Sequence, residues 1–255
     1  MTETTPTTGT AGTGGTAGST DPSAALRVEI WGDIVCPWCY LGAARFERAL
    51  ADFEHRDAVE VVHRSFELDP SREPGTTEPV VELLTRRYGP QAMEMERRLV
   101  GLVQEEGLPY RSERLVGNTL DAHRLLQFAR ERGLQHRLLN VLFAANFARG
   151  EDLFGTEALV RLAGEAGLDV EEARRVLDDP TAYRDAVRAD QRAAAQLGAS
   201  GVPFFVLDGR FGVSGGQPVE VFAEALTRAW GDRAPLTPLG EADADGAVCG
   251  PDGVC

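Results

Sequence analysis

The sequence contains no lysine, so all 26 of its basic side chains are arginines, and 40 acidic side chains outnumber them. The resulting formal charge is −14 at pH 7, and no segment gathers the arginines into a basic stripe. Nucleic acids and anionic membrane surfaces attract clustered positive charge. The sequence therefore predicts no nucleic-acid partner and no membrane partner.

Long apolar runs are also missing. No segment approaches the ~20 apolar residues that a membrane-spanning helix needs. Residues 1–24 lack the apolar core of a signal peptide, and the first basic residue is Arg27. This N-terminal run of Thr, Gly, Ala and Ser is of low complexity, and we expect it to be disordered. The expected location is cytoplasmic.

Cysteine is scarce, with four in the chain, but two of them form the motif Cys36-Pro37-Trp38-Cys39. Alternating apolar residues over 26–35 predict a strand before the motif, and apolar residues at helical spacing over 40–54 predict a helix after it. Pro37 suits the first helical position, because its missing N–H leaves nothing unsatisfied there. We therefore expect Cys36 to lie at the helix N-terminus.

This position assigns different roles to the two thiols. Unpaired N–H groups and the helix dipole stabilise a thiolate at a helix N-terminus, so Cys36 is the predicted nucleophile. Cys39, one helical turn further on, should be more shielded and act as the resolving thiol. The motif alone also fits half of a zinc site or two buried structural thiols. In the cytosol, where permanent disulfides are rare, the catalytic interpretation is favoured.

The middle of the chain is predicted to be helical. Residues 58–68 predict a second strand, parallel to the first through the intervening helix. Residues 78–198 carry almost no strand pattern and several helix boundaries, which is typical of an all-helical insertion. The helix-start signals are Pro90, a capping box of Asp169 and Glu172, and Asp179-Pro180.

Strand character returns near the C-terminus, over residues 202–207 and 211–214, with Asp208-Gly209 as a hairpin turn between them. A final helix over residues 219–230 follows. This order predicts an α/β chain of thioredoxin-like fold (βαβ…ββα) with an all-helical domain inserted after the second strand. The expected boundaries are a low-complexity segment at 1–24, the thioredoxin-like domain at 25–70 and 199–232, the insertion at 71–198 and a tail at 233–255.

Several motifs spread over residues 27–231 resemble the DsbA family of thioredoxin-fold proteins, and in particular the FrnE-type dithiol-disulfide oxidoreductases. The motifs are Cys36-Pro37-Trp38-Cys39, Phe66-Glu67-Leu68-Asp69-Pro70, Asn118-Thr119 with Ala122-His123-Arg124, and Gly201-Val202-Pro203-Phe204-Phe205 leading to Gly212-Val213-Ser214-Gly215. The resemblance implies that Pro203 is cis and faces the dithiol. The Val202 backbone would then be free to pair with an extended substrate peptide beside Cys36.

The chemistry implied is thiol-disulfide exchange with protein or peptide thiols and no bound cofactor. The Cys36 thiolate attacks a substrate disulfide, and Cys39 then attacks the mixed disulfide and releases the reduced substrate. The sequence does not select among oxidase, reductase and isomerase, because direction depends on the redox potential. Glutathione could serve as the reductant. The predicted substrate-binding residues are Pro37, Trp38, Val202, Pro203 and His123.

The other two cysteines, Cys249 and Cys255, lie in the polar tail. One interpretation is an auxiliary redox pair that exchanges with the C-x-x-C, as some FrnE-type proteins carry, although the spacing here is one residue longer. The alternatives are an exposed pair with no catalytic part, or a zinc site of four thiolates shared with Cys36 and Cys39. No other metal site is predicted.

Histidines are few, and only one of the four attracts a functional interpretation. His123 could line the cleft above the dithiol or be a hydrogen-bonded core residue. We see no constellation around His55, His63 or His136. The sequence also has no H-E-x-x-H and no Ser/His/Asp spacing that would indicate a hydrolase.

Two functions of other classes remain open. The architecture also resembles glutathione-dependent kappa-type transferases and 2-hydroxychromene-2-carboxylate isomerases, in which a Ser typically occupies the position of Cys36. The two thiols here therefore favour dithiol chemistry. A binding or chaperone module without turnover is the other alternative. A homodimer is compatible with the sequence, which contains no exposed heptad or apolar strip that would indicate one.

Overall fold

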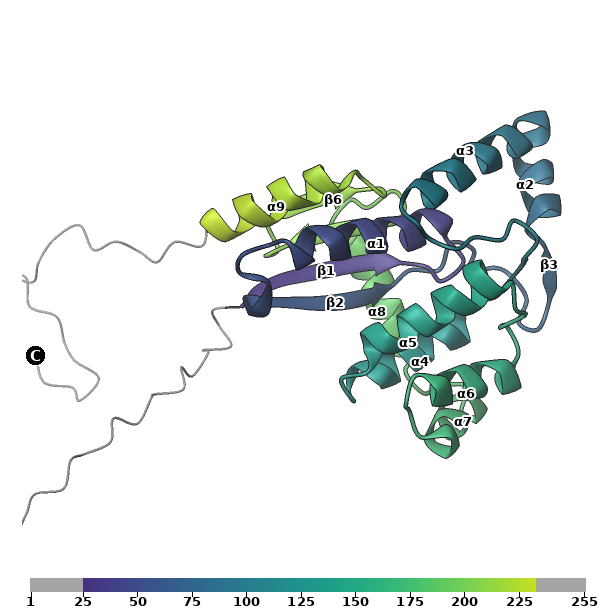
Figure 1. The fold of residues 1–255 in the computed structure, drawn as a ribbon. Helices are drawn as coiled ribbons and strands as arrows, with labels where there is room; N and C mark the ends of the chain where they lie inside the picture. The colour runs from purple at the N-terminus through teal and green to yellow at the C-terminus, as the bar shows by residue number, and fades with distance from the viewer. Residues whose placement is uncertain (1–24, 233–255) are drawn as a thin grey trace, which may run out of the picture.

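The computed structural model describes residues 25–232 and places a four-stranded sheet at the centre of the chain (Figure 1). The strand order is β2-β1-β5-β6. Strands β1 (Leu26–Gly32) and β2 (Val59–Ser65) are parallel, whereas β5 (Phe204–Leu207) runs antiparallel to β1 and β6 (Phe211–Ser214) runs antiparallel to β5. The predicted thioredoxin-like order of strands is confirmed.

Helices cover both faces of this sheet because its strands alternate apolar side chains between the faces. On one face, helices α1 (Pro37–Ala51) and α9 (Val219–Gly231) pack Phe46 and Phe222 against Phe205. On the other face, α8 (Arg184–Gln196) packs Ala194 against Trp31 and Val206. Helices therefore cover both faces of the sheet.

The hairpin between β5 and β6 turns at the predicted residues. Asp208 and Gly209 have φ angles of 54° and 66°, as a tight type I′ turn requires, and the Arg210 N–H donates to the Leu207 carbonyl at 3.0 Å. Asparagine, aspartate and glycine reach this left-handed region most readily. The hairpin turn predicted at Asp208-Gly209 is therefore confirmed, and it follows from the conformational preferences of these two residues alone.

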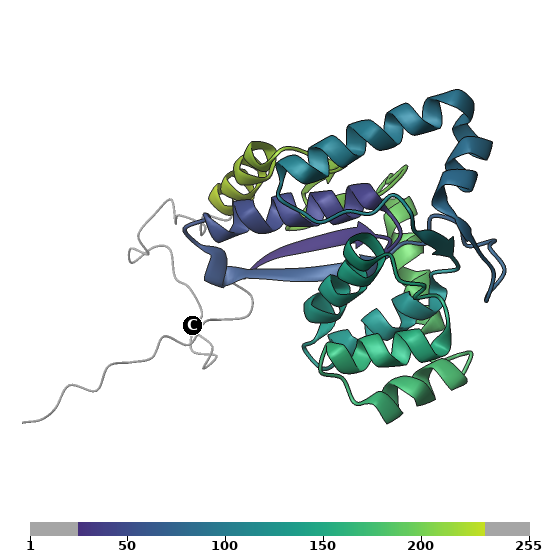
Figure 2. The ribbon, with the colours of Figure 1, turned by 45° about the vertical axis from the view of Figure 1, so that its right-hand side comes forward.

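The insertion follows β2 and is rich in helices (Figure 2). Its helices α2 and α3 form an arm beside the N-terminal end of α1, and α4 to α7 pack together below the sheet in Figure 1. The bounds are α2 (Val80–Tyr88), α3 (Ala92–Glu105), α4 (Leu120–Arg130), α5 (Gln135–Phe143), α6 (Thr156–Glu165) and α7 (Val170–Asp178), with a 3₁₀ turn η3 (Gly89–Gln91) and a π-helical segment η4 (Ala144–Arg149). A further 3₁₀ turn, η2 (Arg56–Ala58), lies outside the insertion, between α1 and β2.

Two features of the insertion differ from the sequence prediction. It is not all-helical, because β3 (Thr77–Pro79) and β4 (Leu115–Gly117) form a small antiparallel sheet. Three-residue strands are too short to produce an alternation pattern. Asp179-Pro180 also does not open a helix: Asp179 caps a turn by accepting from the Thr181 N–H at 2.8 Å, and α8 begins only at Arg184. The capping role of Asp169 is confirmed, since it accepts from the Glu172 N–H at 2.8 Å, whereas Pro90 lies in the 3₁₀ turn η3 that precedes α3.

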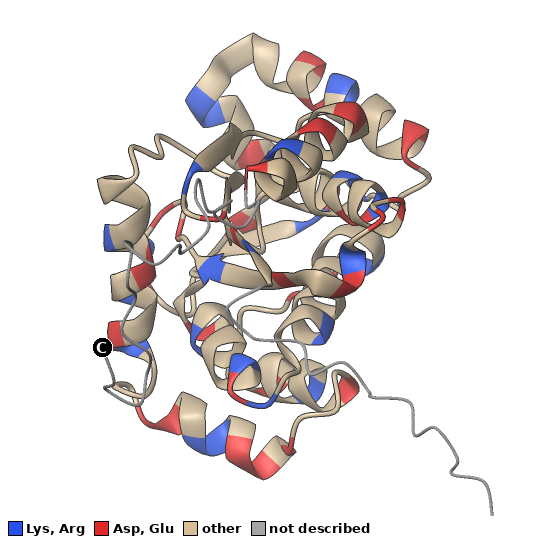
Figure 3. Cartoon of the chain, turned by 90° about the vertical axis from the view of Figure 1, so that its left-hand side faces the viewer, with Lys and Arg blue, Asp and Glu red and all other residues tan. Residues whose placement is uncertain are grey.

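Buried hydrogen bonds join the insertion to the sheet. The Asp190 carboxylate of α8 accepts from Arg64 at 3.0 Å, from the Ser65 N–H at 2.9 Å and from Gln127 of α4 at 2.6 Å. Acidic and basic residues elsewhere are interspersed along the helices in the view of Figure 3. Within residues 25–232, no helix has the length and apolar character needed to cross a bilayer.

A pair of histidines, which the sequence interpretation did not anticipate, joins β2 to α5; His63 is buried and His136 is exposed. His63 Nε2 lies 3.3 Å from His136 Nδ1, and the Gln135 side chain brackets the His63 backbone with two hydrogen bonds. Burial, together with the charge of His136, lowers the pKa of His63 to about 3. His63 is therefore held neutral in the folded protein.

This pKa predicts a specific loss of stability in acid. The unfolded chain protonates His63 below pH ~6.5 while the folded protein resists until pH ~3, so the contribution is complete above 6.5 and is lost as the pH falls between these values. We expect the free energy of unfolding of His63→Leu to fall by roughly 2–5 kcal/mol less than that of the wild type between pH 6.5 and 3. Denaturant titrations across that range measure it. His55→Leu, at a half-buried site outside the pair, is the control and should keep the wild-type slope; an unchanged slope in His63→Leu would contradict the assignment.

Candidate active site

The C-x-x-C lies where β1 runs into α1. Cys36 is the residue before the first helical turn, with extended backbone (φ −82°, ψ 113°), and Pro37 occupies the first helical position. The Cys36 carbonyl accepts from the N–H groups of Cys39 and Tyr40 at 3.0 and 3.2 Å. Cys36 therefore lies at the positive end of the α1 dipole, as the sequence predicts.

Both cysteines are free thiols, and as whole residues they are equally buried, at 4% exposed each. The exposed area therefore does not bear out the expectation that Cys39 is the more shielded of the two. The thiols differ in what they face. Cys36 lines a groove of about 860 Å³, whereas Cys39 lines a narrow cavity beneath the helix.

The Val202–Pro203 peptide faces the dithiol and is cis, as the family resemblance implied. The Cys36 thiol donates to the Val202 carbonyl, with 3.7 Å between sulfur and oxygen. Residues more than 160 positions apart in the sequence are thus brought into contact at the reactive sulfur.

Gly42 of α1 allows the proline loop to approach this helix closely. A Cβ atom added at Gly42 would lie 3.1 Å from the Pro203 ring and 3.1 Å from the Gly216 Cα. The sequence interpretation did not single out Gly42. The available signal was a glycine inside a helical pattern, which indicates a close approach of another segment.

Asp33 is the other site residue that sequence reasoning passed over. Its carboxylate is 1% exposed and accepts from the Leu68 N–H at 2.8 Å and from the Thr119 hydroxyl at 3.3 Å. A second carboxylate oxygen lies 3.4 Å from His123 Nε2. The signal was a charged residue at the end of an apolar strand, three positions before a reactive cysteine.

Electrostatics favours the protonated form of Cys39. Burial raises the pKa of the Cys39 thiol well above its usual value, and the contact with Cys36 and the negative charge of Asp33 add to this rise. The backbone N–H of Asp33 opposes it in part. Cys39 must therefore lose a proton from a disfavouring environment whenever it acts as a nucleophile.

The groove at Cys36 lies between the thioredoxin-like part and the α2–α3 arm. Cys36, Pro37, Trp38 and Val202 all line it, so the structure unites these four predicted site residues. Of the eight large apolar side chains exposed within residues 25–232, four line this groove, namely Trp38, Leu68, Tyr88 and Met95. Concentrated apolar exposure of this kind marks a binding surface.

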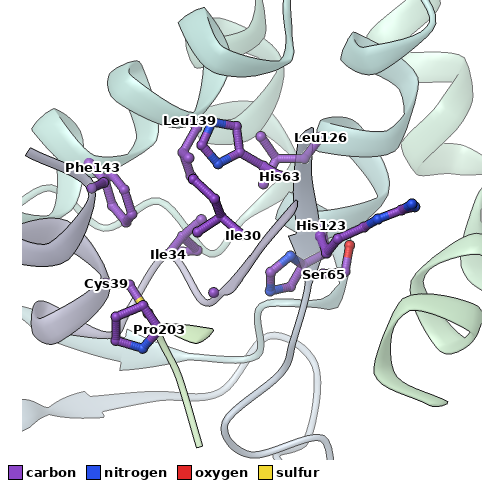
Figure 4. Close-up of a pocket in the computed structure, with 13 residues that line it drawn as sticks. Ile30, Ile34, Cys39, His63, Ser65, His123, Leu126, Leu139, Phe143 and Pro203 are labelled. Carbon is purple, nitrogen blue, oxygen red and sulfur yellow. The ribbon is translucent and has the colours of Figure 1, made fainter. Parts of the chain in front are cut away.

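The structure places the other predicted residues differently. Pro203 and His123 line the narrow cavity with Cys39 (Figure 4), and His123 is only 1% exposed. His123 is therefore not found among the residues of the groove, where a substrate contact was predicted. Cys249 and Cys255, and with them the auxiliary-pair and four-thiolate interpretations, lie outside the described residues.

A dithiol at a helix N-terminus, opposite a cis-proline loop on this sheet, defines a thioredoxin-fold protein of the thiol-redox class. The model of the DsbA-like thioredoxin domain matches residues 27–227 of the chain. The chain belongs to this DsbA-like oxidoreductase family, as the sequence motifs predicted. The finer FrnE-type assignment stays a prediction.

Two relatives cover most of the chain. The crystal structure of a probable DsbA oxidoreductase from Streptomyces coelicolor is 57% identical, with a TM-score of 0.80, over 89% of this chain and 97% of that one. The uncharacterized protein YwbO of Bacillus subtilis is 27% identical over 203 residues, which are 79% of this chain and 96% of YwbO.

A third structure shares the fold alone. A 2-hydroxychromene-2-carboxylate isomerase has a TM-score of 0.60 and 17% identity, over 82% of this chain and 98% of that chain. The same architecture therefore supports more than one chemistry, and the residues of the site must decide between them.

The different environments of the thiols predict different reactivities. We expect iodoacetamide to modify Cys36 at least roughly tenfold faster than Cys39 in the reduced, folded protein near neutral pH, because each unit of raised pKa removes tenfold of the reactive thiolate. Fragment-ion mass spectrometry of the peptide that carries both cysteines gives the two rates. Denatured protein is the control and should show similar rates. Similar rates in the folded protein would contradict the electrostatic argument.

Proposed function

We propose that the chain is a thiol-disulfide oxidoreductase that acts on protein or peptide substrates through Cys36 and Cys39. The observation that carries the proposal is the position of Cys36, whose thiol lies at a helix N-terminus and opens into an apolar groove. The helix terminus favours the thiolate, and the groove offers apolar contacts beside the sulfur.

The reaction has two exchange steps. The Cys36 thiolate attacks one sulfur of a substrate disulfide, the S–S bond breaks, and its electron pair leaves on the second substrate sulfur. Cys39 then loses its proton and attacks Cys36 Sγ in the mixed disulfide, which releases the first substrate sulfur as a thiolate. The reverse sequence oxidises a substrate dithiol. An external thiol, such as glutathione, would return the Cys36–Cys39 disulfide to the reduced form.

The Val202 backbone supports an extended substrate. Its carbonyl lies beside the Cys36 sulfur, at the end of the loop that leads into β5. A peptide segment that carries the attacked cysteine can pair with this backbone in the manner of an added strand. Its neighbouring side chains would then fall into the groove, against Leu68 and Met95.

Trapping the intermediate tests the proposal. We expect Cys39→Ser to accumulate mixed disulfides between Cys36 and polypeptide clients in cells, because the resolving step is blocked. Non-reducing gels followed by mass spectrometry identify what is held, and Cys36→Ser is the matched control that should hold nothing. Glutathione adducts alone, together with retained isomerase turnover of an aromatic substrate, would overturn the proposal in favour of the isomerase type.

The groove itself provides a matched pair of variants. Met93 and Met95 are both 49% exposed on α3, but only Met95 lines the groove. We expect Met95→Gln to lower kcat/KM for reduction of an unfolded, disulfide-bonded polypeptide by roughly three- to tenfold, since apolar contact area is lost. Reduction of a small aliphatic disulfide should not change.

Met93→Gln is the control for this substitution and should behave as the wild type with both substrates. Equal losses in the two variants, or an equal loss with the small disulfide, would show that the groove does not bind the polypeptide.

A further inference from the structure

A small cavity lies between the second cysteine and the insertion. It is lined by Cys39 of α1, His123 of α4, and His63 and Ser65 of β2, with apolar walls from β1 and α5 (Figure 4). About 20 Å³ is open to the centre of a water molecule, which is room for one water. A thiol and an imidazole thus share a cavity of the size of a single water.

His123 is unsatisfied in this position. Its side chain is buried, and within residues 25–232 neither Nδ1 nor Nε2 has a hydrogen-bond partner. The nearest charged atom is Asp33 Oδ1, at 3.4 Å from Nε2. Buried polar nitrogens are rarely left without a partner, and a bound water commonly supplies one.

The site also needs a proton acceptor at this place. Cys39 must give up a proton as it attacks the mixed disulfide, and the raised pKa of its buried thiol makes spontaneous loss rare. The acceptor has to lie within hydrogen-bond reach of the sulfur, directly or through one water.

We propose that His123 accepts the Cys39 proton through one water bound in this cavity, with the Asp33 carboxylate orienting the ring and stabilising the imidazolium. The proposal rests on the exchange function proposed above. It assigns His123 to the resolving step, in place of the substrate contact that the sequence suggested.

The S–H bond of Cys39 breaks, an S–S bond forms between Cys39 and Cys36, and the bond from Cys36 to the substrate sulfur breaks with its electron pair on the substrate. The proton passes through the water to His123. The imidazolium then returns it to solvent or to the departing thiolate, so no further reactant is needed.

The neighbouring histidine and arginines are poor acceptors for the Cys39 proton. His63 faces the same cavity from β2, but its pKa of about 3 and its contact with His136 of α5 keep it from accepting a proton at neutral pH. Arg64 of β2 is paired with Glu29 and with Asp190 of α8, and Arg124 on α4 itself is paired with Asp121.

Separating the two exchange steps tests the proposal. A nitrobenzoate disulfide releases one coloured thiolate when Cys36 attacks and a second when Cys39 resolves, so stopped-flow absorbance reports each step. The full-length protein with Cys249→Ser and Cys255→Ser is the background, so that only Cys36 and Cys39 report. We expect His123→Gln to slow the second release roughly 10- to 100-fold near neutral pH and to leave the first within about twofold.

The pH profile distinguishes proton transfer from a structural role. The deficit of His123→Gln should shrink as the pH rises, because hydroxide can then take the Cys39 proton. His55→Gln makes the same substitution at a half-buried site that does not line the cavity, and should behave as the background protein in both steps. Wild-type second-release rates in His123→Gln, or equal slowing of both releases at every pH, would overturn the proposal.

A measurement on the unsubstituted site covers the case in which His123→Gln does not fold. In the background protein, the solvent deuterium isotope effect should be larger on the second release than on the first, and equal effects would overturn the proposal. Failure of Cys36 to release the first thiolate would instead count against the exchange function itself, so the two failures are distinguishable.

Discussion

The arrangement of the site depends on one buried carboxylate, that of Asp33. It accepts from the Leu68 N–H and the Thr119 hydroxyl, and so ties the β1–α1 turn to the segment after β2 and to the start of α4. A charge this deeply buried is tolerated only when donors surround it. The C-x-x-C begins three residues later. The hydrogen bonds that satisfy the Asp33 carboxylate therefore also position both sulfurs.

This constraint makes the insertion part of the site. Thr119 and His123 come from α4, and the outer wall of the groove comes from α2 and α3. The thioredoxin-like elements supply the thiols and the proline loop, whereas the inserted helices determine which residues surround them. Differences in chemistry between proteins of this architecture are therefore expected to arise in the insertion, where the groove and the buried polar contacts are built.

Local signals in the sequence were sufficient for much of the fold. Cys36 before a helix, Pro37 at the helix start and Asp208-Gly209 at a turn each obey rules that involve only neighbouring residues. The cis Val202–Pro203 peptide followed from family resemblance and not from composition. The sheet of β3 and β4 was missed because its strands are too short to show a period.

The missed contacts are those that join distant segments. Asp33 was passed over, because its partners Leu68 and Thr119 lie 35 and 86 positions away. His63 and His136 are separated by 73 positions, and no spacing rule relates them. His123 was noticed through its motif, but its cavity depends on where α4 and α5 pack against the sheet. Side-chain chemistry can be read from sequence, while burial and pairing of this kind need the folded chain.

The contact of α1 with the proline loop has a different physical character from the rest of the site. It is made by Gly42, Gly216 and the Pro203 ring, which leave no room for a Cβ atom at Gly42 and carry no ionisable group. Hard-core repulsion does not respond to ionic strength or proton activity, unlike the ion pairs and hydrogen bonds around it. The spacing between the reactive sulfur and the loop is therefore set sterically, and it should persist while the thiols, histidines and carboxylates around it change their charge.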